Sequence, residues 1–133
     1  MAATGVPIGL IQLFRLNGSI RNAAMSALYG RSNEIRKLFL DRPELRKYFF
    51  DGADISEDDP AYGVVVTIAE MFLNLQEEKT VLRADIGGDW PTWRDGRDAL
   101  VANSPIVRHV LKTRPERYHR ELVALADQIA ART

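Results

Sequence analysis

The first forty residues contain a helical repeat of apolar side chains that is longer than one small domain needs. Apolar residues recur at intervals of three or four positions, or sums of these, as one face of an α-helix requires. They are Leu13, Leu16, Ile20, Ala24, Ala27, Ile35 and Leu38. The pattern predicts a helix over about residues 8–40, with Asn17-Gly18 as the point where it kinks or breaks. Such a helix would be roughly 50 Å long, so we expect part of it to pack on a partner or a second copy.

The remainder of the chain also has the spacing and punctuation of helices. Helix starts are indicated where a capping residue stands next to a proline or near a glutamate. We expect such starts at Asp41-Arg42-Pro43-Glu44, Asp59-Pro60, Asp89, Ser104-Pro105 and Thr113-Arg114-Pro115-Glu116. The helix that begins at Asp59 is expected to end at Gly87-Gly88. No segment has the strict alternation of a half-buried strand. The prediction is an all-α fold, a compact bundle of five to seven helices in one domain over residues 1–133, with residues 1–40 as the long N-terminal helix.

Composition excludes several classes of site and partner. The 133 residues include no cysteine, so a disulfide, a thiolate nucleophile and a cysteine zinc site are excluded. Basic and acidic residues number 18 each, which removes the whole-chain argument for a nucleic-acid partner. No run of about 18 apolar residues exists, which argues against an integral membrane protein. The apolar stretch from Val6 to Leu16 has no basic residue before Arg15, so we expect no secretion signal and a cytoplasmic location.

The neutral total hides an uneven charge distribution. Residues 1–48 carry eight bases and three acids, a net charge of +5. Residues 49–98 carry four bases and twelve acids, a net charge of −8, and residues 99–133 carry six bases and three acids, a net charge of +3. We expect the acidic middle to pair with the basic ends, within one chain or between copies.

No motif for catalysis, a metal or a cofactor is present. The two histidines, His109 and His119, belong to no HExxH pattern, and the acidic loop 51–59 lacks the oxygen ligands of an EF-hand. Neither a glycine-rich phosphate loop nor a G-x-S-x-G elbow occurs. We therefore expect no catalytic residue, no metal ligand and no cofactor, and a protein that is not an enzyme.

Aromatic and arginine side chains are the best candidates for an interaction or ligand site. Trp90 and Trp93 lie three residues apart, where Arg94 or Arg97 can stack on an indole. The pair either anchors an interface, where Trp and Arg are enriched, or covers the end of the core. Within Tyr48-Phe49-Phe50 not all three rings can be buried on one side, so one is expected to be exposed or to contact another chain. The full candidate set is Phe14, Ile20, Ala24, Ala27, Phe50, Phe72, Trp90, Trp93, Arg94 and Arg97.

Four segments together resemble a loose group of uncharacterised bacterial helical proteins. They are Pro43-Glu44-Leu45-Arg46-Lys47-Tyr48-Phe49, Ala69-Glu70-Met71, Trp90 with Trp93, and Ser104-Pro105-Ile106-Val107. The resemblance covers roughly residues 35–118 and implies a helical fold. Members of that group often carry a membrane-anchoring helix before this region, whereas Val6–Leu16 is too short and polar to span a bilayer. The group implies no activity and no catalytic residues.

Three hypotheses for function follow. The preferred one is a non-enzymatic helical module for protein–protein interaction or self-association, a homo-oligomer whose long first helix makes the contact. The first alternative is a helical domain that binds a small or lipid-like ligand between the central helix and the tryptophan helix, where Phe72, Leu75, Trp90 and Trp93 would line the pocket. The second is peripheral membrane association through the N-terminal apolar segment, which includes Phe14.

Overall fold

A computed structural model describes residues 8–132, which are all-α as predicted and contain no β-strand. The start of the N-terminal apolar segment at Val6 lies outside the described residues. The helices are α1 (Ile8–Asp41), α2 (Lys47–Phe50), α3 (Tyr62–Val81), α4 (Arg83–Ile86), α5 (Trp90–Asn103), α6 (Pro105–Thr113) and α7 (Arg120–Arg132). Short 3₁₀ turns precede α2, α5 and α7, namely η1 (Pro43–Leu45), η2 (Gly87–Asp89) and η3 (Pro115–Arg117).

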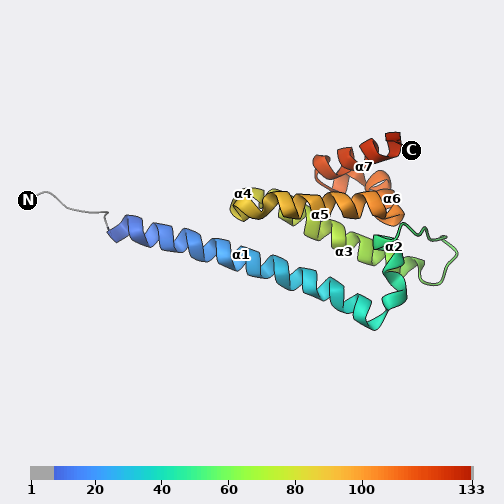
Figure 1. The fold of residues 1–133 in the computed structure, drawn as a ribbon, viewed down its shortest axis with the longest axis horizontal. Helices are drawn as coiled ribbons and strands as arrows, with labels where there is room; N and C mark the ends of the chain where they lie inside the picture. The colour runs from blue at the N-terminus through green and yellow to red at the C-terminus, as the bar shows by residue number, and fades with distance from the viewer. Residues whose placement is uncertain (1–7, 133) are drawn as a thin grey trace, which may run out of the picture.

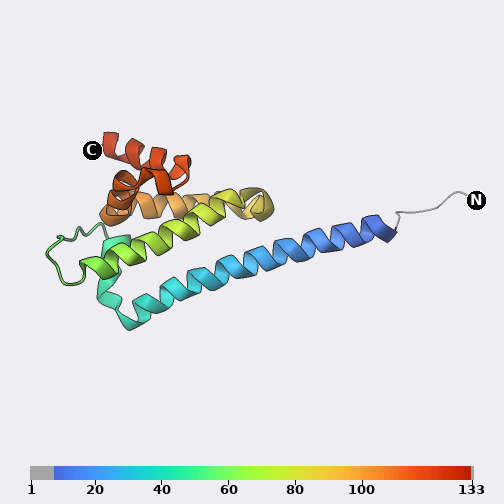
Figure 2. The same ribbon diagram turned by 180° about the vertical axis from the view of Figure 1, so that it is seen from behind.

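The body of the molecule is a helical bundle arranged around α3. Helix α3 packs against α1 on one side and α6 on the other, and α6 also contacts α5 and α7. Figures 1 and 2 show α1 along one side of this body and α7 on the opposite side. The side chains of Phe49, Val65, Leu73, Leu111 and Leu122 are fully buried at the centre. The apolar faces that the sequence repeats predict therefore meet in one core.

Helix α1 is the long N-terminal helix that the sequence predicts. It continues through Asn17-Gly18 without interruption. Only its second half joins the core, through Leu28, Ile35 and Phe39. The first half leaves the body and extends well beyond it, as Figures 1 and 2 show. Residues 8–23 are all exposed, and we call them the projecting segment.

Several helix boundaries differ from the sequence prediction. The helix expected to run from Asp59 to Gly87 divides at Leu82 into α3 and α4. This break turns Ile86 into the core, where it is buried, so the gain from burying an apolar side chain overrides a continuous helix. The last helix was expected to open at Thr113, yet α6 continues to that residue and α7 begins at Arg120.

The capping prediction was right at Ser104, whose Oγ accepts a hydrogen bond from the Val107 amide at 3.3 Å at the start of α6. It was wrong at Asp59, because the N-cap of α3 is Ala61 and has no side-chain cap; Asp59 Oδ1 accepts from the Ala61 amide at 2.8 Å in the turn before the helix. Asp89 precedes α5 but makes no side-chain capping bond, because its backbone already belongs to the turn η2. Asp41, also expected to cap a helix, is instead the last residue of α1, and the following turn η1 has no side-chain cap.

Candidate functional site

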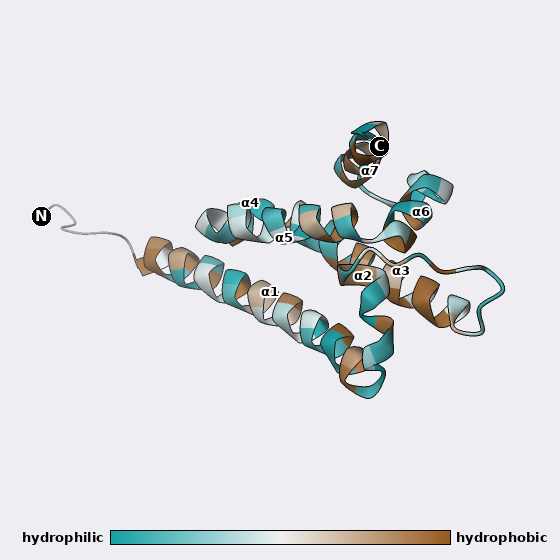
Figure 3. Cartoon of the chain, turned by 45° about the vertical axis from the view of Figure 1, so that its right-hand side comes forward, coloured by the Kyte–Doolittle hydropathy of each residue, from teal (hydrophilic) through white to brown (hydrophobic). Residues whose placement is uncertain are grey.

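The projecting segment has apolar side chains that no part of the body covers. Phe14 is 65% exposed and Ile20 is 58% exposed. The large apolar side chains exposed in the segment are Ile8, Leu10, Ile11, Leu13, Phe14, Leu16 and Ile20. In Figure 3 the first turn of α1 is brown, and hydrophobic and hydrophilic colours alternate along the turns that follow. A soluble monomer rarely exposes so many neighbouring apolar side chains, so the segment is a candidate contact surface.

A second candidate site is a groove of about 1000 Å³ where the second half of α1 faces α3 and α5. We call it the basic groove. Its volume is at the upper end of the range found for small-molecule sites. The lining residues are Leu28, Tyr29, Ser32, Arg36, Phe39, Leu40, Pro43, Arg46, Phe50, Phe72, Leu75, Gln76, Lys79, Thr92, Trp93, Gly96, Arg97 and Leu100. The groove thus combines a large apolar surface with four cationic side chains.

Phenylalanine rings cluster at one end of the basic groove. Phe39 and Phe72 are stacked with ring centroids 5.9 Å apart, and Phe50 meets Phe72 edge-on at 6.1 Å. Arg46 lies over the Phe50 ring, with Cζ 4.8 Å from the centroid. Packing of this kind fixes the rings against one another. Phe50 is the exposed ring of the triplet, whereas Tyr48 and Phe49 are buried, in agreement with the sequence prediction.

At the other end, two cations lie beside an aromatic pair. Tyr29 and Trp93 form an edge-to-face contact with centroids 5.4 Å apart. The Lys79 ammonium lies 4.8 Å from the Trp93 centroid, within cation–π range. Burial, and then the nearby positive charge of Arg36, lower the pKa of Lys79. None of the residues that line the groove is acidic, although Arg97 is paired with Asp98 and Glu121 just outside it.

Gln76 is a buried polar side chain in the wall of the basic groove. It is only 6% exposed, and its Oε1 atom has no hydrogen-bond partner. A buried amide oxygen without a donor costs about 1–3 kcal/mol. Such a group is unusual in a well-packed interior and is a candidate contact for a bound molecule.

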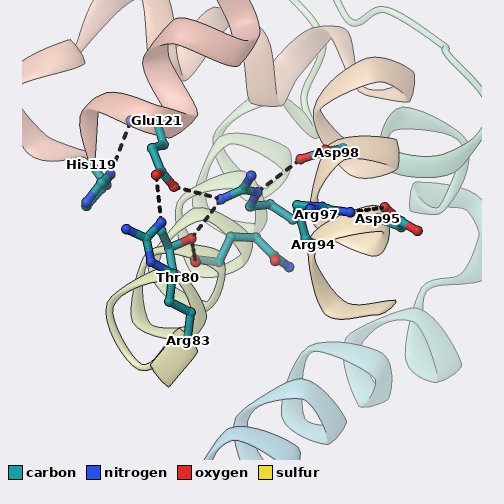
Figure 4. Close-up of polar contacts among 9 residues, drawn as sticks. Thr80, Arg83, Arg94, Asp95, Arg97, Asp98, His119 and Glu121 are labelled. Atoms are coloured by element: carbon teal, nitrogen blue, oxygen red, sulfur yellow. Dashed lines mark hydrogen bonds and ion pairs between the residues drawn. The ribbon is translucent and has the colours of Figure 1, made fainter. Parts of the chain in front are cut away.

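Arg97 fixes the inner wall of the groove through a polar network, shown in Figure 4. Its side chain is 9% exposed. It donates to Asp98 and to Thr80 Oγ1, both at 3.1 Å, and to Glu121 Oε2 at 3.4 Å. Arg83 donates to Glu121 Oε1 at 2.6 Å, and this hydrogen bond is the main cause that lowers the pKa of Glu121. The network joins α5 to α3 and α7.

The structure separates the candidate residues into four places. Phe50, Phe72, Trp93 and Arg97 line the basic groove. Trp90 is half-buried beside it, with Arg97 Cζ 5.4 Å from its ring, and does not line it. Arg94 lies outside, where it pairs with Asp95 at 3.7 Å. The remaining candidates lie on α1. They are the exposed Phe14, Ile20 and Ala27 and the half-buried Ala24.

The groove residues that sequence reasoning missed are Arg36, Arg46, Gln76 and Lys79. A signal for some of them was present. Phe72, Gln76 and Lys79 recur at intervals of four and three residues, so they share one face of α3. Only the approach of α1 and α5, however, shows that this face lines a groove rather than solvent.

The described part of the chain has neither a metal-binding cluster nor a membrane-spanning helix. Among residues 8–132 no cluster of three or more His, Asp or Glu side chains is arranged to hold a metal ion. None of the helices in the same range is both long and apolar enough to cross a membrane.

Comparison with known proteins found no related protein. No protein-family model, curated protein sequence or solved structure matches this chain.

Proposed function

We propose that the protein is a non-enzymatic interaction module that associates with a second copy of itself through the projecting segment. The observation that carries the proposal is the exposure of the seven large apolar side chains between Ile8 and Ile20. The segment continues α1 beyond the body by about 24 Å. An α-helix that exposes this much apolar surface gains free energy when a partner removes it from water.

The distribution of apolar residues around the helix favours a helical partner. Leu13 and Phe14 are neighbours in sequence, so their side chains point about 100° apart, and Leu16 and Ile20 point in further directions. A helix that is apolar on several faces is normally buried among other helices. The small residues Ala23, Ala24 and Ala27 follow directly in sequence and permit close approach of a second backbone.

Charge complementarity supports a second copy as the partner. The projecting segment carries Arg15 and Arg21 and no acid. Asp85 in α4 and Asp89 in η2 are exposed, and Figure 1 shows α4 at the end of the body from which α1 projects. In an antiparallel pair of projecting segments, residue 8 of one copy lies opposite residue 23 of the other, so Arg15 comes toward the carboxylates of the other copy while Arg21 stays beside its own body. The same match occurs within the chain, where Arg31 of α1 pairs with Glu78 of α3 at 2.5 Å.

Sedimentation equilibrium of the full chain between 1 and 100 µM tests the proposal. The unaltered protein is expected to self-associate in this range. Phe14→Glu places a charge in the contact and is expected to leave a monomer, because burying an unpaired carboxylate is costly. A chain that stays monomeric at every concentration would overturn the proposal.

Leu40→Glu is the matched control. Leu40 lies on the same helix and is 81% exposed, but it is at the opposite end of α1. We expect it to associate like the unaltered protein, and an equal loss of association in both variants would refute a contact at the projecting segment. Binding of the unaltered monomer to anionic vesicles, lost in Phe14→Glu, would instead assign the segment to a membrane surface.

A further inference from the structure

We propose that the basic groove is a binding site for a small amphiphilic anion, a molecule with an apolar body and one negatively charged head group. The groove lies on the body, between the second half of α1 and the helices α3 and α5. The projecting segment is not part of it. This inference is therefore independent of self-association.

The apolar body would lie on the phenylalanine cluster. Phe39, Phe50 and Phe72 line the groove together with Leu75 and Leu100. Phe50 and Leu40 remain exposed in the structure, so a ligand that covers them removes apolar surface from water. Residues 29 to 40 of α1 follow the groove from one end to the other, a distance of about 17 Å, which suits an elongated molecule.

The head group would lie between Arg36 and Lys79. Among the described residues neither cation has an ion-pair partner, although the chain contains 18 carboxylates. The acid next to Lys79 in sequence, Glu78, is already paired with Arg31. Lys79 is half-buried and Arg36 is exposed, and the pKa of Lys79 is lowered first by burial and then by the repulsion from Arg36. An anion bound between Arg36 and Lys79 would attract both cations and offset their mutual repulsion.

Two further observations concern which class of molecule can occupy the basic groove. The unpartnered amide of Gln76 lies in the same wall as Lys79. The oxygen of this amide is an acceptor, whereas the NH₂ group of the same amide is the donor that an anionic head group requires. The projecting segment of a second copy does not suit the groove, because its Arg15 and Arg21 would face four cationic side chains. An anionic molecule is the complementary choice.

Calorimetric titration of the full chain with two probes of equal chain length tests the charge requirement. The probes are dodecanoate and dodecyltrimethylammonium, both below their micelle concentrations. We expect saturable binding of dodecanoate at one site and binding of the cation weaker by at least about tenfold. Equal affinity for the two head groups would overturn the proposal, and so would equal affinity for dodecanoate and acetate, because the apolar body would then contribute nothing.

Fluorescence locates the site. Trp90→Phe leaves Trp93, beside Lys79, as the single tryptophan. In this background dodecanoate is expected to change the emission of Trp93 with the affinity found by calorimetry. An unchanged emission at saturation would place the ligand elsewhere and refute the assignment to the groove.

Charge removal completes the test. Lys79→Met and Arg36→Met keep most of the length of each side chain and are each expected to weaken dodecanoate binding by about tenfold. Lys37→Met is the matched control, since Lys37 neighbours Arg36 on α1 but does not line the groove. Far-UV circular dichroism verifies that each variant is folded. Affinity that is unchanged in both Lys79→Met and Arg36→Met would contradict the proposal.

Discussion

Ser104 offers the sharpest test of how the fold is held together, because its hydroxyl makes two different hydrogen bonds. The side chain is 0% exposed. Its Oγ accepts from the Val107 amide at 3.3 Å, which caps α6, and donates to the Tyr48 carbonyl at 2.7 Å, which ties α2 to the start of α6. Helix α2 in turn carries Phe50, which lines the basic groove.

Ser104→Ala removes both bonds with little change in volume. Loss of an N-cap side chain costs about 1 kcal/mol. The buried Tyr48 carbonyl has no other hydrogen-bond donor among the described residues, and an unsatisfied buried acceptor adds about 1–3 kcal/mol. We therefore expect the free energy of unfolding to fall by about 2–4 kcal/mol, a large share of the roughly 5–15 kcal/mol typical of a domain.

Urea denaturation at 25 °C, followed by far-UV circular dichroism, measures this change. Ser56→Ala is the control, since Ser56 Oγ also accepts a local amide hydrogen bond, from Asp58 at 3.2 Å, but is exposed. We expect Ser56→Ala to change the free energy of unfolding by less than about 0.5 kcal/mol. If Ser104→Ala costs no more than this control, the hydroxyl does not join the two helices as argued.

Two further predictions concern the polar network around Arg97 and the turn η2 that precedes α5. The pKa of Glu121 is lowered because Arg83 donates a hydrogen bond to its carboxylate. The ionised carboxylate therefore stabilises the fold at pH values above 4.5, the ordinary pKa of the group, and this stabilisation is lost as the pH falls through the lowered pKa. Since the side chain of Glu121 is 37% exposed, we expect Glu121→Gln to cost about 1 kcal/mol in urea denaturation at pH 7 and progressively less as the pH falls below 4.5; a cost that does not decrease with pH would exclude the charge as the cause. Gly87 has a φ of 65° and a ψ of −127°, so Gly87→Ala is expected to lower the free energy of unfolding by about 1–3 kcal/mol. Gly88 is the control, because its φ is not positive and an added Cβ would meet no atom within 4 Å. We expect Gly88→Ala to leave the free energy of unfolding unchanged, and equal costs at the two glycines would show that backbone strain is not the reason.

Much of the fold could be read from the sequence because it depends on local chemistry. The intervals between Leu13 and Leu38 predicted a helix that the structure shows as α1, and Ser104 was placed correctly as a cap. The errors lie where tertiary burial competes with local preference. Leu82 interrupts the expected long helix so that Ile86 enters the core, and no pattern within the segment itself reveals that gain.

For the two candidate sites too, the sequence determines one part and the tertiary structure decides the other. Residues 8–23 contain apolar side chains at helical spacing, and the repeat to which they belong already predicted a helix too long for one small core. Only the structure decided that the body covers the second half of α1 and leaves the first half exposed. The basic groove depends on tertiary structure almost entirely. Arg36 and Lys79 are 43 positions apart in the chain, and their charges act together only because α1 packs against α3 and brings them to the same groove.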